Sequence, residues 1–178
     1  MIVASLLENL KIEKRVSITP EIVGKYKSLG MEVILQNGYG HHLGFGEKEY
    51  LDKGVKFYKS QTEVIEKANI IIQMNFLERE LVSNLKTNQT LIGILNPYQN
   101  KKELQNLVNK KINLFSLELL PRITRAQSMD ILSSQANLAG YKAVLESFST
   151  FEKAIPMMMT AAGTVPAAKV LVVGAGVA

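Results

Sequence analysis

A short stretch near residue 125 combines side chains that could hold a polar ligand. Two of the chain's four arginines, Arg122 and Arg125, lie just ahead of Gln127, Asp130 and Ser133. The guanidinium of Arg122 is a rigid fork of donors that suits a carboxylate, a phosphate or an amide oxygen. Gln127, Asp130 and Ser133 could hold the carboxamide and ribose hydroxyls of a nicotinamide. No nucleophile and base accompany them, which suits hydride transfer between two nicotinamides, where the protein only aligns two rings and excludes water.

The element that must position these side chains is predicted to be a helix. Thr124 and Gln127 have the spacing of a capping box, and this capping role is a purely structural alternative for Gln127. One predicted face carries short hydrogen-bonding groups instead of the Lys and Glu typical of a solvated face, so we expect it to line a cleft. The polar face is Gln127, Asp130, Ser134, Asn137 and Tyr141, and the opposite face is Met129, Leu132, Ala136, Ala139 and Ala143. The small residues around Gly140 permit close approach of another element.

A second candidate site lies in the glycine-rich stretch "KVLVVGAGVA", residues 169–178. We expect a buried strand that ends at Gly174, followed by Gly176 and Val177. In a dinucleotide fold the first glycine makes the tight turn and the second lets the backbone approach the pyrophosphate. The third glycine and the acid that binds the ribose would lie after residue 178. The stretch is therefore interpreted as an incomplete fingerprint, and the alternative is a strand that ends in a simple glycine turn.

Short apolar runs alternate with amphipathic segments along the first two thirds of the chain. Thr19, Pro20 and Glu21 open a predicted helix as N-cap, first-turn proline and first-turn acid, and Gly30 ends it. The predicted strands are 2–7, 31–36, 69–74, 90–95 and 112–118, and the other helices are 62–68, 78–85 and 101–110. Strands that are apolar almost throughout, with helices between them, predict a parallel sheet covered on both faces.

The alternation breaks near residue 150, which predicts a boundary. We expect an α/β, Rossmann-like first domain over residues 1–125, a linking helix over 126–150, and the truncated start of a second, dinucleotide-binding Rossmann domain over 151–178.

Composition excludes several classes of protein. The 178 residues are 47% hydrophobic and 21% charged, without any cysteine, which excludes disulfides and thiolate metal sites. The net charge of +5 comes from lysines scattered among acids, so we expect a solvated surface and no nucleic-acid partner. His41 and His42 lie in a glycine-rich loop and are expected to be surface residues, and we predict no metal site. No apolar run is long enough to span a membrane, so we expect a soluble, cytoplasmic chain.

Four segments together are similar to one family: "EKRVSITP", "NPYQN", "PRITRAQSMDILSSQANLAGYKAV" and "TAAGTVPAAKVLVVGAGVA". The chain resembles the N-terminal region of the NAD(H)-binding α subunit of proton-translocating NAD(P) transhydrogenase. The resemblance implies that Arg122, Asp130 and Ser133 hold the nicotinamide end of NAD(H). It implies that Gln127 reaches across to NADP(H) on a partner β subunit, and that the pyrophosphate lies over Gly174 and Gly176, next to Val177. It also implies a homodimer at the membrane, where partner segments couple hydride transfer to proton passage.

Alanine dehydrogenases resemble the chain in architecture and provide the alternative function. That branch uses an Arg, a Lys and a His to bind and polarise a keto acid. Arg15 matches the Arg, but Gln73 stands at the Lys position and Asn96 at the His position. Loss of both removes the acid and base that an amino acid substrate needs, so the transhydrogenase function is preferred. A third possibility is a non-catalytic fragment that serves only in dimerisation or docking.

Overall fold

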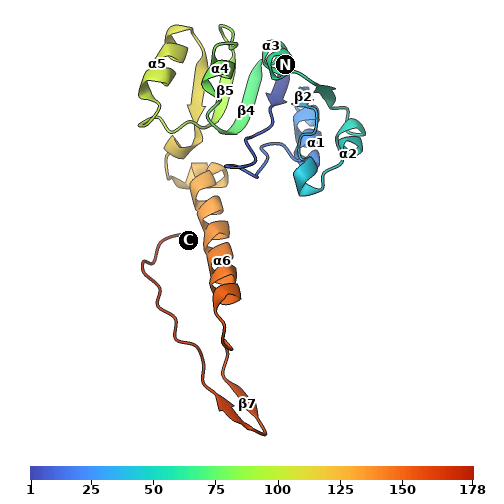
Figure 1. Ribbon diagram of the computed structural model, residues 1–178. Helices are drawn as coiled ribbons and strands as arrows, with labels where there is room; N and C mark the ends of the chain where they lie inside the picture. The colour runs from blue at the N-terminus through green and yellow to red at the C-terminus, as the bar shows by residue number, and fades with distance from the viewer. The chain divides into compact units, whose positions relative to one another are not determined.

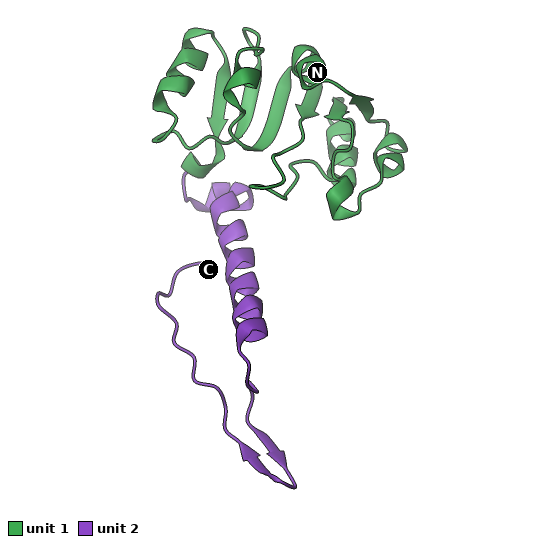
Figure 2. Cartoon of the chain, viewed as in Figure 1, with its two compact units in different colours: residues 1–120 green, residues 121–178 purple.

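The computed structural model describes all 178 residues. The chain divides into two compact units, residues 1–120 and residues 121–178 (Figure 2). The first unit holds every buried apolar side chain except that of Ala126.

Unit 1 is a six-stranded, fully parallel sheet with the strand order β3-β2-β1-β4-β5-β6 (Figure 1). Its strands are β1 (Ile2–Ser5), β2 (Glu32–Gln36), β3 (Lys56–Tyr58), β4 (Ile70–Asn75), β5 (Thr90–Ile94) and β6 (Asn113–Ser116). Its helices are α1 (Pro20–Ser28), α2 (Glu47–Leu51), α3 (Gln61–Lys67), α4 (Arg79–Val82) and α5 (Lys101–Asn109), with short 3₁₀ turns at His41–Leu43 and Leu117–Leu119. This order is that of a Rossmann fold, with the topological switch point between β1 and β4. The predicted fold class is confirmed.

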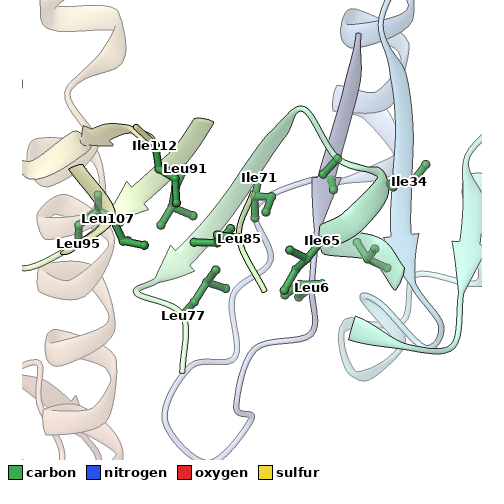
Figure 3. Packing of buried hydrophobic residues seen from close by; sticks show 13 residues of the cluster. Leu6, Ile34, Ile65, Ile71, Leu77, Leu85, Leu91, Leu95, Leu107 and Ile112 are labelled. Atoms are coloured by element: carbon green, nitrogen blue, oxygen red, sulfur yellow. The ribbon is translucent and has the colours of Figure 1, made fainter. Parts of the chain in front are cut away.

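The core consists of two apolar clusters, one on each face of the sheet. Successive residues of a strand point to opposite faces, so Val3 belongs to one cluster and Ala4 to the other. The cluster drawn in Figure 3 includes Ile65 from α3 and Leu107 from α5. The second cluster contains Val23 from α1. Helices therefore cover both faces, which is why the central strands are largely apolar.

A β-bulge interrupts β4 where it pairs with β5. The register with β5 runs from Ile72 opposite Ile92 to Asn75 opposite Ile94, so β4 holds one residue more than β5 over this interval. Gly93 of β5 faces the bulge, and a Cβ there would lie 3.3 Å from the carbonyl carbon of Gln73 and closer still to its oxygen. The absence of a side chain at position 93 thus lets the bulged backbone approach.

Unit 2 begins with a 3₁₀ helix, Thr124–Met129, and continues as the 20-residue helix α6, Ile131–Thr150. The capping box expected at Thr124 is wrong, because the N-cap of α6 is Asp130, whose carboxylate accepts from the Ser133 N–H. Asp130 has ψ of 90°, which is not helical, so Gln127 does not share a helix face with the residues of α6. Neither predicted face of α6 is buried. No helix of the chain combines the length and the apolar content needed to cross a membrane.

The rest of unit 2 holds an antiparallel hairpin of β7 (Met158–Thr160) and β8 (Gly163–Val165). The strand expected at residues 169–173 is absent: the segment has no regular secondary structure, and Val173 is 92% exposed. The β-branched pattern favours a strand, but a strand forms only when a neighbour accepts and donates its backbone hydrogen bonds, and here none does.

Candidate functional site

A pocket of about 390 Å³ in unit 2 gathers most of the residues expected to hold a ligand. It lies where the 3₁₀ helix meets the start of α6. Its lining is Pro121, Arg122, Ile123, Thr124, Ala126, Gln127, Asp130, Ser133 and Val177. The four polar residues singled out from the sequence therefore surround one space, and Val177 of the glycine-rich stretch lies beside them. Arg125, the second arginine of this stretch, is exposed and does not line the pocket.

Asp130 and Ser133 form a fixed pair at the start of α6. One Asp130 oxygen accepts from the Ser133 N–H at 3.0 Å, and the other accepts from the Ser133 hydroxyl at 2.6 Å. These two hydrogen bonds hold the pKa of the Asp130 carboxyl below its usual value, and the nearby Arg122 charge acts in the same direction. Asp130 is therefore ionised at neutral pH, and its carboxylate is an acceptor of fixed position.

The 3₁₀ helix sets the places of Arg122 and Gln127. Ala126 is buried and anchors the turn, while its N–H donates to the Ile123 carbonyl at 2.9 Å. The Gln127 carbonyl accepts from the Asp130 N–H at 3.3 Å, which ties the turn to the N-cap of α6. Arg122 and Gln127 are exposed. The pocket thus offers a guanidinium, an amide and a carboxylate, with apolar walls at Ile123 and Ala126.

The two glycines of the glycine-rich stretch do not line this pocket. Gly174 has φ of 104°, a left-handed conformation that favours glycine, and a Cβ at Gly176 would meet open space. The backbone bends at Gly176, and only Val177 of this stretch reaches the pocket.

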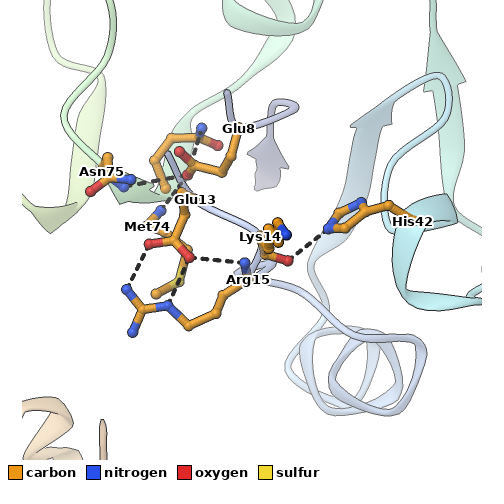
Figure 4. A network of polar contacts seen from close by, with 8 residues as sticks. Glu8, Glu13, Lys14, Arg15, His42, Met74 and Asn75 are labelled. Atoms are coloured by element: carbon orange, nitrogen blue, oxygen red, sulfur yellow. Dashed lines mark hydrogen bonds and ion pairs between the residues drawn. The ribbon is translucent and has the colours of Figure 1, made fainter. Parts of the chain in front are cut away.

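A second polar site lies in unit 1 at the switch point, where the carboxyl ends of β1 and β4 meet. Buried Gln73 uses both ends of its amide: its oxygen accepts from the Ser5 hydroxyl at 2.8 Å and the Leu6 N–H at 2.7 Å, and its nitrogen donates to Glu8 at 3.1 Å. The same Glu8 oxygen accepts from the Met74 N–H at 2.7 Å and from the Asn75 N–H at 3.3 Å (Figure 4). Glu8 thus satisfies the backbone donors that the β4 bulge frees. Burial raises the pKa of Glu8, and these backbone N–H groups oppose the rise.

The other residues of the alanine dehydrogenase pattern are engaged within unit 1. Arg15 forms a bidentate ion pair with Glu13, at 2.8 Å and 2.6 Å, which holds the pKa of Glu13 below its usual value (Figure 4). His42 donates from Nε2 to the Lys14 carbonyl at 2.6 Å, so the glycine-rich loop is tied to the segment that carries Arg15. The N–H of Asn96 donates to Glu118 at 2.6 Å.

Models of two protein-family domains match consecutive segments of the chain. The alanine dehydrogenase/PNT N-terminal domain matches residues 6–139, and the alanine dehydrogenase/PNT C-terminal domain matches residues 143–178. The chain belongs to the alanine dehydrogenase/PNT family. Within this family the chain is 40% identical to an NAD(P) transhydrogenase subunit alpha protein of Rickettsia prowazekii, a match that covers the whole chain and 48% of that protein. It is 26% identical to alanine dehydrogenase of Methanococcus maripaludis, over 93% of the chain and 44% of that protein.

A solved structure of transhydrogenase from Sinorhizobium meliloti has the same architecture. The TM-score is 0.92 at 41% sequence identity, and the match covers 99% of this chain and 53% of that chain. The chain spans about half the length of each of these three proteins. The family recognised from the sequence motifs is confirmed.

Sequence reasoning did not find Glu8. An acid that follows the first strand, in "SLLENL", is an ordinary surface feature by pattern. Its role depends on a bulge more than 60 residues away in the chain, and only the isolated glycine of "TLIGIL" hinted at that bulge.

Proposed function

We propose that the chain belongs to the NAD(H)-binding component of a proton-translocating transhydrogenase. The observation that carries this proposal is the pocket of unit 2, where Arg122, Gln127, Asp130 and Ser133 surround one space. These residues fit the nicotinamide end of a dinucleotide. The Arg122 guanidinium suits the carboxamide oxygen, and the fixed Asp130 carboxylate suits its N–H groups or a ribose hydroxyl.

The chemistry supplied by the bound dinucleotide is hydride donation or acceptance at its ring. The residues of the pocket bind and orient that ring. Asp130 stays ionised and holds no proton to transfer, and the pocket lining contains no His, Lys or Cys. Such a site suits direct hydride transfer, a reaction that is accelerated by aligning the two rings and excluding water. Gln127, which is exposed at the rim of the same pocket, is the residue we assign to face NADP(H) on a partner β subunit.

The pyrophosphate of NAD(H) lies, in this proposal, over the turn made by Gly174, Gly176 and Val177. The left-handed Gly174 and the contact of Val177 with the pocket support this assignment. The catalytic complex would also contain membrane segments that couple hydride transfer to proton passage. We propose that the chain works as a homodimer in the cytoplasm, held at the membrane through these partners.

The contacts of unit 1 favour this function over amino acid dehydrogenation. Gln73 is committed at both ends of its amide, and Arg15 is paired with Glu13. No acid or base stands at the Gln73 and Asn96 positions to polarise a keto acid.

The proposal is tested by titrating the ¹⁵N-labelled chain with NADH up to millimolar concentrations. A few charge-assisted hydrogen bonds at ~1.5–3 kcal/mol each barely offset the ~4–15 kcal/mol cost of association, so we expect a dissociation constant in the millimolar range. Amide shifts should be confined to residues 121–133 and to residues 174–178, the glycine turn. Arg122→Ala should abolish them, whereas Arg125→Ala, which removes the neighbouring arginine outside the pocket, should not. Shifts centred on unit 1, or equal loss in both variants, would exclude this site and leave the docking alternative.

A further inference from the structure

Gly140 lies in the middle of α6, where a glycine is costly. Glycine weakens a helix interior relative to alanine because it has more freedom to lose on folding. α6 runs without a break from Ile131 to Thr150, so Gly140 does not end it. An isolated glycine at such a position calls for an explanation in the packing around it.

The reason is the backbone of the glycine turn. A Cβ built on Gly140 would lie 2.7 Å from the carbonyl carbon and 3.1 Å from the Cα of Ala178, and it would overlap the Ala178 oxygen. All three neighbours are backbone atoms of Ala178, so a side chain at position 140 would displace the main chain there and not merely the tip of another side chain. In Figure 1 the C-terminal end of the chain lies beside α6. The missing side chain of Gly140 therefore leaves a notch into which the turn fits.

The notch and the pocket lie on the same side of one helix. Ser133, which lines the pocket, precedes Gly140 by two helical turns, so the two positions point in nearly the same direction and are about 10 Å apart along the axis. Val177 is the residue before Ala178 and lines the same pocket as Ser133. The contact between the turn and Gly140 therefore determines the position of Val177 relative to Asp130 and Ser133.

We propose that Gly140 is a positioning residue that fixes the distance between the glycine turn and the nicotinamide pocket. The inference rests on the proposed function, because it gives the notch a role in holding the two ends of one dinucleotide. α6 then acts as a rigid spacer: its first turn carries the nicotinamide-side groups, and its middle holds the pyrophosphate-side turn. Any side chain at position 140 moves that turn away from the helix.

The test measures the turn directly and needs no ligand. Because the chain has no cysteine, Ser149→Cys and Val173→Cys place two nitroxide labels, one on α6 and one ahead of the turn, at exposed positions. Gly140→Ala should shift the mean label distance by roughly 1–2 Å and broaden its distribution. The new Cβ and the Ala178 backbone must move apart to an ordinary contact distance of ~3.5–4 Å. Gly140→Leu should shift it further. Far-UV circular dichroism should show undiminished helix in both variants, because both residues favour helix more than glycine does.

The matched control is Gly24→Ala in α1, where a Cβ would meet nothing within 4 Å; it should leave the label distance unchanged. Unchanged distances in both Gly140 variants would overturn the proposal. NADH shifts in the labelled-amide titration report the proposed function separately. If the Gly140 substitutions change the label distance but NADH does not bind near Arg122, the contact between Gly140 and the turn is supported and its role in dinucleotide binding is refuted.

Discussion

The Gln73 amide connects two segments, because its oxygen accepts from the Leu6 N–H and its nitrogen donates to Glu8. A lysine at this position lacks the acceptor, and a glutamate lacks the donor. Gln73→Lys keeps a donor toward Glu8 but has no acceptor for the Leu6 N–H, which is fully buried. An orphaned buried N–H costs ~1–3 kcal/mol. The new ammonium does not recover this cost, because its own desolvation offsets its attraction to Glu8. We therefore expect Gln73→Lys to lower the free energy of unfolding by about 1–3 kcal/mol.

Gln73→Glu has the opposite defect. It keeps acceptors for Ser5 and Leu6 but loses the donor to Glu8 and sets two carboxylates side by side. The loss of a hydrogen bond to a charged group costs ~1.5–3 kcal/mol, and repulsion adds to it. Protonation of either carboxyl relieves the repulsion, so this variant should recover stability as the pH falls toward about 4, whereas Gln73→Lys should not.

The assay is urea unfolding followed by far-UV circular dichroism between neutral pH and a pH of about 4. Gln61, the first residue of α3, lines one surface pocket together with Gln73. Gln61→Lys and Gln61→Glu are therefore matched controls, expected within ~0.5 kcal/mol of the parent chain. The reasoning fails if the Gln73 variants are as stable as these controls, or if Gln73→Lys is the more stable protein. Either outcome would mean that the hydrogen bonds of Gln73 do not stabilise the fold.

Four further outcomes are expected. Gly93→Ala should lower the free energy of unfolding by ~1–3 kcal/mol by overpacking against the β4 bulge, as urea unfolding would show; a neutral effect would contradict the close approach. The pKa of Glu13 is lowered by Arg15, so its contribution to stability is present above the unfolded value of 4.5 and is lost as the pH falls through the lower folded value; Glu13→Gln should flatten this acid loss in pH-dependent unfolding. A longer chain with the rest of the family's second domain should not oxidise NADH with pyruvate and ammonia, and robust turnover would refute the transhydrogenase function. In that longer chain with its partner subunits, Gln127→Asn should lower the rate of hydride transfer more than NADH affinity; an equal loss of both would remove Gln127 from the partner side.

The parallel sheet of unit 1 could be predicted because its signals are local and agree with one another. Buried runs such as "NIIIQM" and capped helices such as the one opening at Pro20 each specify the same architecture. The edge strand β3 was not predicted, since Lys56, Phe57 and Tyr58 are too few and too mixed to differ from a loop.

The sequence drew attention to residues that one pocket gathers, but it did not predict their local geometry. Thr124 and Asp130 are both good N-cap residues, and the sequence alone does not decide between them. The choice matters, because capping at Asp130 uses its carboxylate for Ser133 and puts Gln127 on a separate turn. The expected strand at residues 169–173 depends on a neighbouring strand, which is a non-local condition that a β-branched pattern does not reveal.

Buried apolar side chains are distributed very unevenly along this chain, since unit 2 contributes only Ala126 to them. The heat-capacity change of unfolding comes mainly from apolar surface that becomes hydrated, at ~12–15 cal/mol/K per residue of an ordinary domain. For the 120 residues of unit 1 this amounts to about 1.4–1.8 kcal/mol/K, whereas a domain of all 178 residues would give about 2.1–2.7 kcal/mol/K. A calorimeter should therefore record the smaller value, and the heat absorbed on melting should be that of a protein two thirds the size of the chain.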